Sequence, residues 1–258
     1  MRGIDALTFH SIHDYYPANG RYKTMTDKTI NMYESLMTLP LFKGISYKRV
    51  SEMVGSTRLS FLKYLPGETI FQARTKSDHI KFVFSGKVRL TMTSGNDRVS
   101  IEQTLTAPAI IQPDYLFGRS TQYPVSAKAI DTVSIIEMDK PSLLTLLRED
   151  EVILFNFLNI LATDAQKTTD GMMAVISGSI EERIAFWIIS MTQMGSEGIV
   201  LRARARDLYT VFGVARSSFI AALDHMVSEG IIEYTSTEIR VRSRKQLRGI
   251  LLNHPELT

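Results

Sequence analysis

Two short apolar helical patterns, separated by a glycine, constrain the fold of this chain most, and they lie within residues 204–232. Leu208, Val211 and Phe212 fall on one face of the first helix, and Gly213 can adopt the positive φ that ends it. A second apolar stripe follows at helical spacing, formed by Phe219, Ala222, Leu223, Met226 and Val227. We therefore predict a helix-turn-helix whose second helix begins near Ala215 and buries this stripe.

The opposite face of the second helix carries Arg216, Ser217, Ile220, Ala221 and Asp224. In a helix-turn-helix, the N-terminal residues of the second helix meet base edges in the major groove. We predict that Arg216 reads a base and that Ser217 and Ser218 donate hydrogen bonds to bases or phosphates. A small helical hairpin with no DNA-binding role would show a similar apolar pattern, so the residues that follow are needed to distinguish the two.

A short β-hairpin is predicted directly after the second helix. Glu229-Gly230 precedes the apolar pair Ile231-Ile232, and polar residues 235–237 then lead into the alternating residues 238–242. A hairpin in this position is the wing of a winged helix-turn-helix. We expect Arg204, Arg240 and Arg242 to contact phosphates, and the base-contacting set to include Ala221.

The order RDLYTVFGVARSSFIAALDHMVSEGIIEY, followed by IRV, resembles the C-terminal winged helix of the CRP/FNR superfamily of bacterial transcription regulators. The resemblance implies that Arg216 reads a guanine, because an arginine in its place commonly does so in the family. A glutamate usually follows that arginine, and a second basic residue lies further along the helix. Here Ser217 and Ala221 occupy those positions, so the family's common operator sequence is not assumed.

Residues 58–138 show a different, β-type pattern. Short β-rich runs cover residues 59–64, 80–84, 87–92 and 133–138, with turn residues at 66–67, 85–86 and 94–97. Short strands at near-regular spacing predict a sandwich or barrel, here a jelly roll or β-roll. Residues 64–71 and 82–90 resemble the cyclic-nucleotide-binding jelly roll. LPLFKGIS at 39–46 resembles the opening of CRP/FNR sensor domains. Around it we predict short helices over residues 31–39 and 46–55.

The phosphate-binding cassette of nucleotide-binding family members is altered in this chain. In those members a Gly-Glu pair engages ribose and phosphate, and an Arg-Ser pair clamps the phosphate. Aligned on Ala127-Lys128-Ala129, the Arg-Ser pair falls on Tyr123-Pro124, and the Gly-Glu pair becomes Pro113-Asp114. Proline lacks the backbone N–H that could bind phosphate. We expect neither cyclic AMP nor cyclic GMP to bind at physiological concentration.

The β-roll then either senses a different molecule, apolar or weakly polar, or serves as a ligand-free scaffold. A shifted loop that carries Arg119-Ser120 inward is the alternative, and it would restore an unusual nucleotide site. The resemblance places Thr168 and Thr169 where family members meet a nucleotide base. The candidate effector pocket comprises Asp114, Arg119, Ser120, Tyr123, Thr168 and Thr169.

A long helix is predicted between the two patterns. After Glu149-Asp150-Glu151, apolar and small residues repeat at alternating steps of four and three, which is typical of a coiled-coil seam. We predict a dimer seam formed by Leu154, Leu158, Leu161, Ala165, Thr168, Met172 and Val175. An amphipathic helix lying on the β-roll is the alternative. Gly178 is a candidate hinge. Ser179 with Glu182 matches a capping box at the start of the next helix. That helix carries Trp187, the single tryptophan, as a predicted core residue.

The predicted fold class is α+β. It combines a disordered leader (1–30), a β-roll sensor domain (31–149), a dimerisation helix (150–178) and a winged helix-turn-helix domain (179–258). Within the leader, Met25 opens a segment that looks like a natural start. Asp139 is the expected N-cap of a helix at the end of the sensor domain.

Composition excludes several classes. The chain has no cysteine, which rules out disulfides, thiolate zinc sites and Cys-held iron–sulfur clusters. It has no run of about 18 apolar residues and no apolar region of a secretory signal at its N-terminus, so we expect a soluble cytoplasmic protein that does not engage a membrane. Residues 199–258 hold nine Lys/Arg against six Asp/Glu, which suits phosphate contacts. His10 and His13 lack further ligands, and no metal site or cofactor is predicted.

A homodimeric DNA-binding regulator acting on a palindromic operator is the leading hypothesis, with double-stranded DNA, a second copy of the chain and an unknown small-molecule effector as partners. RNA polymerase is a further candidate partner. An enzyme built on a cupin-like β-roll would need clustered histidine and carboxylate metal ligands inside the barrel, whereas His79 is the only histidine in that region of the sequence. A ligand-binding regulatory module that never touches DNA is the third hypothesis, and it would not need Arg216 or the wing.

Overall fold

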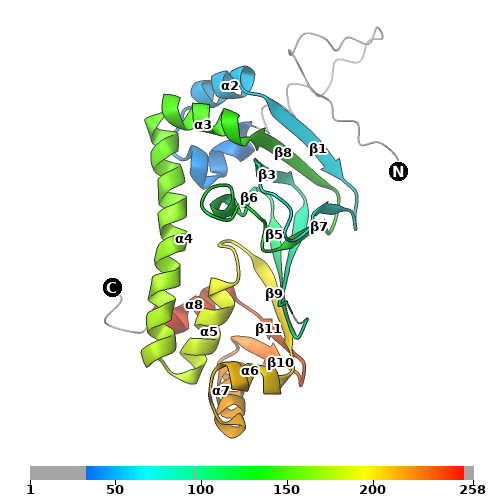
Figure 1. Cartoon of the computed structure of the whole chain (residues 1–258), viewed down its shortest axis with the longest axis vertical. Coiled ribbons are helices and arrows are strands. Elements are labelled where there is room, and N and C mark those ends of the chain that lie inside the picture. Colours follow the sequence, from blue (N-terminus) through cyan, green and yellow to red (C-terminus); the bar gives the residue numbers. More distant parts are fainter. Residues whose placement is uncertain (1–32, 96, 253–258) are drawn as a thin grey trace.

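The computed structural model describes residues 33–252 except residue 96, and within this range the side chains of residues 167–177 and 252 are left out of the description. The predicted leader, with His10 and His13, lies outside the described residues. Figure 1 shows a β-roll at one end, a winged helical unit at the other and one long helix running beside both.

The β-roll consists of two antiparallel sheets packed face to face. Helical residues 33–38, the short helix η1 (Pro40–Phe42) and α2 (Tyr47–Ser56) precede it. Its strands are β1 (Leu59–Tyr64), β2 (Thr69–Phe71), β3 (His79–Ser85), β4 (Lys87–Thr93), β5 (Val99–Thr106), β6 (Ala109–Ile111), β7 (Ser126–Ala129) and β8 (Val133–Asp139), with the short helix η2 (Pro113–Tyr115) after β6. One sheet has the order β1-β8-β3-β6, and the other contains β2, β7, β4 and β5. The predicted jelly roll is thus confirmed.

Two helices complete this half of the molecule: α3 (Lys140–Glu149) and α4 (Glu151–Ser177). The Asp139 side chain accepts a 2.7 Å hydrogen bond from the Ser142 N–H, which confirms it as the N-cap of α3. Helix α4 is about 40 Å long at 1.5 Å per residue. Its inner face buries Ile153 and Phe157 against the β-roll core.

The C-terminal half is a winged helix-turn-helix, as predicted. Its elements are α5 (Ile180–Ser190), β9 (Glu197–Ala203), α6 (Ala205–Val211), α7 (Arg216–Ser228), β10 (Ile232–Tyr234), β11 (Glu238–Val241) and α8 (Arg244–Leu252). The capping box of Ser179 and Glu182 is present. Gly213 has a φ of 63° at the turn between α6 and α7, and β10 pairs with β11 as the wing hairpin.

One sheet runs through both halves of the molecule, which the sequence analysis did not anticipate. Strand β9 pairs with β11 on one side and with β5 of the β-roll on the other, giving the order β10-β11-β9-β5-β4-β7-β2. The side chain of Arg202 on β9 reaches Glu102 on β5 (2.7 Å) and Glu238 on β11 (3.1 Å). The path of β9 alongside β5 can be followed in Figure 1.

Three side chains differ from their predicted burial. Val227 in the last turn of α7 is 38% exposed, and Val211 in the last turn of α6 is 62% exposed, where it lines an open cavity. Trp187, predicted as core, is only partly buried. Its ring packs edge-on against Phe212, with centroids 5.8 Å apart, while the rest of the ring lines an open cavity.

Candidate nucleic-acid interface

Helix α7 presents one buried and one open face. Phe219 is fully buried, and Leu223 and Met226 are nearly so, which anchors the helix on the C-terminal core. The other face leaves the predicted base-contacting residues exposed together near its N-terminal end: Arg216, Ser217, Ser218 and Ala221. A cationic side chain with small polar neighbours at this end of a helix matches what major-groove readout requires.

The three predicted phosphate contacts are exposed and each is paired with a carboxylate. Arg204, the N-cap residue of α6, binds Asp207 at 2.9 Å, and this hydrogen bond lowers the pKa of Asp207. Arg242 binds Glu233 at 2.8 Å, and Arg240 pairs with Glu238. Exposed pairs of this kind contribute little to stability, so a phosphate can replace the carboxylate at small cost.

The wing also orients the recognition helix through a contact that the sequence did not reveal. The Tyr234 hydroxyl on β10 donates a 2.5 Å hydrogen bond to Asp224 Oδ1 on α7, and this bond raises the pKa of Tyr234. The pair holds the Asp224 carboxylate on the open face of the helix. The contact joins two elements across a turn, so periodicity within either one carries no signal of it.

The four described residues of the predicted effector pocket are divided between the protein interior and its surface. Tyr123 is 2% exposed and stacks on Phe71, with ring centroids 3.9 Å apart, and burial raises its pKa to about 12. Asp114, Arg119 and Ser120 lie at the surface instead. Thr168 and Thr169 lie on α4, where side chains fall outside the described part of the chain.

The residues directly before η2 form hydrogen bonds with the C-terminal half of the molecule. Gln193, after α5, accepts a 3.0 Å hydrogen bond from the Gln112 N–H and donates one to the Ile110 carbonyl. Its own N–H donates to Gln103 Oε1 at 2.7 Å, and Gln103 is 1% exposed. The two halves are therefore joined by buried polar contacts as well as by the shared sheet.

The first two positions of the predicted seam on α4 are exposed in the single chain. Leu154 and Leu158 are 38% and 54% exposed. Leu161 is partly buried, Ala165 is exposed, and the side chains of Thr168, Met172 and Val175 are outside the described set. The same surface includes Val152 (46% exposed) and Phe155 (65%), which the seam prediction missed because they fall between its heptad positions.

The chain was compared with known protein families and structures. Residues 61–150 match the cyclic nucleotide-binding domain family. A CRP-like cAMP-activated global transcriptional regulator from Mycobacterium tuberculosis is 22% identical over 227 residues, covering 84% of this chain and 98% of that relative.

The comparison with solved structures found the Thermus thermophilus catabolite activator protein, with a TM-score of 0.44, 22% identity and coverage of 83% of this chain and 98% of that one. Another is the sensor domain of the transcriptional regulator DNR from Pseudomonas aeruginosa, with a TM-score of 0.47, 15% identity and coverage of 57% and 95%.

The chain therefore joins a β-roll of the cyclic nucleotide-binding domain type, through one long helix, to a winged helix-turn-helix. Over most of its length the chain is similar to a CRP-like transcriptional regulator, and residues 61–150 match the cyclic nucleotide-binding domain family. Across residues 33–252 no helix is long and apolar enough to cross a membrane. His79 pairs with Asp78, and no group of three potential metal ligands gathers among the described residues.

Proposed function

We propose that this protein is a sequence-specific DNA-binding regulator that acts as a homodimer on a palindromic operator. The observation that carries the proposal is the open N-terminal face of α7, where Arg216, Ser217 and Ser218 are exposed while the opposite face is buried. Arg216 is the proposed guanine reader, because its guanidinium can donate two hydrogen bonds to one guanine edge.

The backbone contacts in this proposal come from both sides of α7. Arg204 lies at the start of α6, and Arg240 and Arg242 lie on or directly after β11 of the wing. Each exchanges its carboxylate partner for a phosphate, and counterion release then contributes to affinity. RNA polymerase is proposed as a partner at the promoter.

The homodimer is proposed to form through α4. An apolar stripe that includes Leu154, Leu158 and Phe155 is exposed along a helix whose other face is already buried in the β-roll. Burying this stripe against its two-fold copy removes apolar surface from water. Two symmetric recognition helices would then bind two half-sites of opposite orientation.

The β-roll is proposed not to bind cyclic AMP, although the M. tuberculosis relative is named as cAMP-activated. Tyr123 and Phe71 stack where a polar phosphate clamp would be needed, and Arg119 lies at the surface. Pro113 has no N–H to offer an anion, and the Gln112 N–H already donates to Gln193.

Selection from random double-stranded DNA tests the DNA-binding function. We expect the full chain to enrich one palindrome with a guanine in each half-site. Enrichment of no sequence would contradict the proposal and favour a regulatory module that never touches DNA. A non-palindromic product would retain DNA binding and reject the symmetric dimer.

Titration calorimetry with cyclic AMP and cyclic GMP tests the altered cassette. We expect no saturable heat in the micromolar range for either nucleotide, because Arg119 is exposed and the buried Tyr123 stands where the family's clamping arginine aligns. Micromolar binding that is lost in Arg119→Ala would contradict this and restore Arg119 as a phosphate clamp. Lys128→Ala, which removes an exposed cation on β7, is the matched control.

A further inference from the structure

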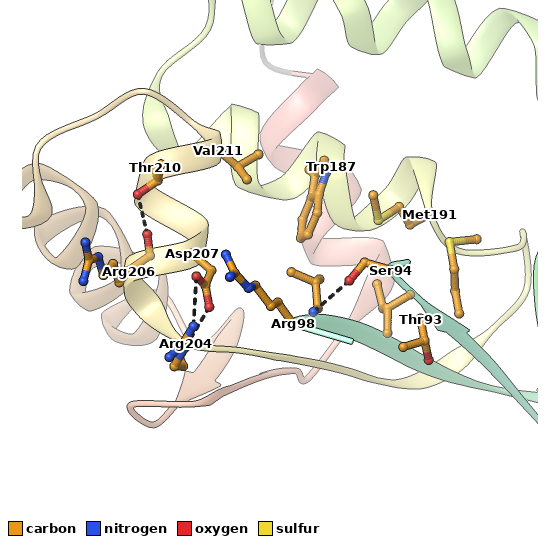
Figure 2. Close-up of a pocket in the computed structure, with 13 residues that line it drawn as sticks. Thr93, Ser94, Arg98, Trp187, Met191, Arg204, Arg206, Asp207, Thr210 and Val211 are labelled. Atoms are coloured by element: carbon orange, nitrogen blue, oxygen red, sulfur yellow. Dashed lines mark hydrogen bonds and ion pairs between the residues drawn. The ribbon is translucent and has the colours of Figure 1, made fainter. Parts of the chain in front are cut away.

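A cavity of about 740 Å³ lies between the two halves of the molecule, outside the β-roll interior. The β4–β5 hairpin forms one wall, α5 a second and α6 a third (Figure 2). Its volume falls within the range of small-molecule sites in proteins, about 300–1,000 Å³. No residue of the predicted effector pocket lines it.

The floor of the cavity is apolar. Figure 2 shows Trp187 projecting from α5 toward the hairpin, with Met191 beside it. The apolar lining is completed by Met92, Val99, Ile101 and Val211. Thioether and aromatic side chains make favourable contacts with aromatic rings beyond the burial of area. The exposure of Val211 and the partial burial of Trp187 both follow from their position on this floor.

The opposite end of the cavity is cationic. Arg98 extends from the hairpin, and Arg204 and Arg206 come from the first turn of α6. Asp207 is the one carboxylate among the lining residues, and it pairs with Arg204 and also interacts electrostatically with Arg98 and Arg206. In Figure 2 the Arg98 side chain extends toward the cavity, whereas Arg206 points away from it. The guanidinium groups of Arg98 and Arg204 beside one carboxylate leave a net positive charge, which favours an anion.

We infer that this cavity is a second ligand site, which takes an aromatic carboxylate. The ring lies against Trp187 and the two methionines, and the carboxylate meets the guanidinium group of Arg98. Because these walls belong to the β-roll hairpin and to the first helix of the helix-turn-helix, the ligand contacts both halves of the chain at once.

Fluorescence of Trp187 gives a direct measurement of occupancy, because it is the only tryptophan in the chain. We would titrate the full chain, without DNA, with 4-butylbenzoate as the probe, and confirm the stoichiometry by calorimetry. The neutral 4-butylbenzamide tests the need for charge, and decanoate tests the need for a ring. We expect saturable binding of the benzoate at least about tenfold tighter than that of the other two compounds.

Two variants locate the site. Val211→Asp adds a negative charge at an exposed position of the lining, and Val227→Asp makes the same change at an exposed position of α7 outside the cavity. Arg98→Gln removes the cation that extends toward the cavity, with Arg248→Gln on α8 as its control. We expect benzoate affinity to fall about tenfold or more in Val211→Asp and Arg98→Gln and to be retained in both controls.

Several results would overturn the inference: no saturable binding of the benzoate up to millimolar concentration, equal binding of the amide or of decanoate, or equal losses in the cavity variants and their controls. Since DNA is absent from the experiment, a negative result leaves the proposed DNA-binding function unaffected.

Discussion

At the scale of single residues, the side chain of Arg216 combines exposure with a place at the first position of the recognition helix. Replacing it by alanine removes the proposed bidentate contact and leaves the buried face of α7 unchanged. We expect Arg216→Ala to cost about 1–3 kcal/mol at the contacted base pair and to relax specificity there.

Competition binding to the selected operator, and to the operator changed at that base, measures the effect. Arg248→Ala, which removes an exposed arginine on α8, is the control and should bind both DNAs as the wild type does. An unchanged base preference in Arg216→Ala would remove Arg216 from the reading role.

Gln193 is the second residue with a testable role. Its side chain satisfies the Gln112 N–H and the Ile110 carbonyl, both on nearly buried residues. Gln193→Ala leaves these groups without their partner, and an unsatisfied buried polar group costs about 1–3 kcal/mol. Urea unfolding measures the loss, and Gln246→Ala on the exposed surface of α8 should be neutral. Equal stability of wild type and Gln193→Ala would mean that water replaces the glutamine.

At the scale of elements, α4 has two apolar faces with different partners. The inner face packs on the β-roll, and the outer face exposes Leu154, Leu158 and Phe155. A helix that is apolar on both faces is expected to be covered on both. This requirement follows from the helix as a whole rather than from any one of its leucines.

The double variant Leu154→Glu/Leu158→Glu tests the outer face. Two carboxylates in an apolar interface would be desolvated without partners, so we expect the dimer to dissociate at micromolar concentration. Sedimentation velocity measures this. Leu65→Glu, at a leucine that is 56% exposed on the turn after β1, is the matched control and should remain dimeric. A monomeric wild type would reject the seam and the palindrome with it.

At the scale of the whole molecule, the shared sheet couples the two halves. Hydrogen bonds between β5 and β9 and the contacts of Arg202 with Glu102 and Glu238 cross the boundary. We expect a single unfolding transition, with Trp187 fluorescence and far-ultraviolet circular dichroism giving the same midpoint.

Reversing the charge in Arg202→Glu places three carboxylates on adjacent strands, and we expect the two midpoints to separate because like charges facing each other across strands are destabilising. Arg248→Glu supplies the control for charge alone. Different midpoints in the wild type would show that the halves unfold independently despite the shared sheet.

The sequence by itself determined the elements whose causes are local. Helical spacing around Gly213 predicted the helix-turn-helix, alternation predicted the wing, and the capping residues Asp139 and Ser179 were correctly placed. Each of these depends on residues within a few positions of one another. A local signal of this kind is read directly from the order of the residues.

Only the tertiary structure decided the contacts between distant segments. Gln193 bonds to Gln103 and Gln112, which lie 90 and 81 residues away, and β9 pairs with β5 across a similar separation. Whether Trp187 enters the core or lines a cavity depends on where the β4–β5 hairpin lies. Periodicity states which face of an element is apolar, but the partner of that face is set by how all the elements pack together, and no window of sequence contains that information.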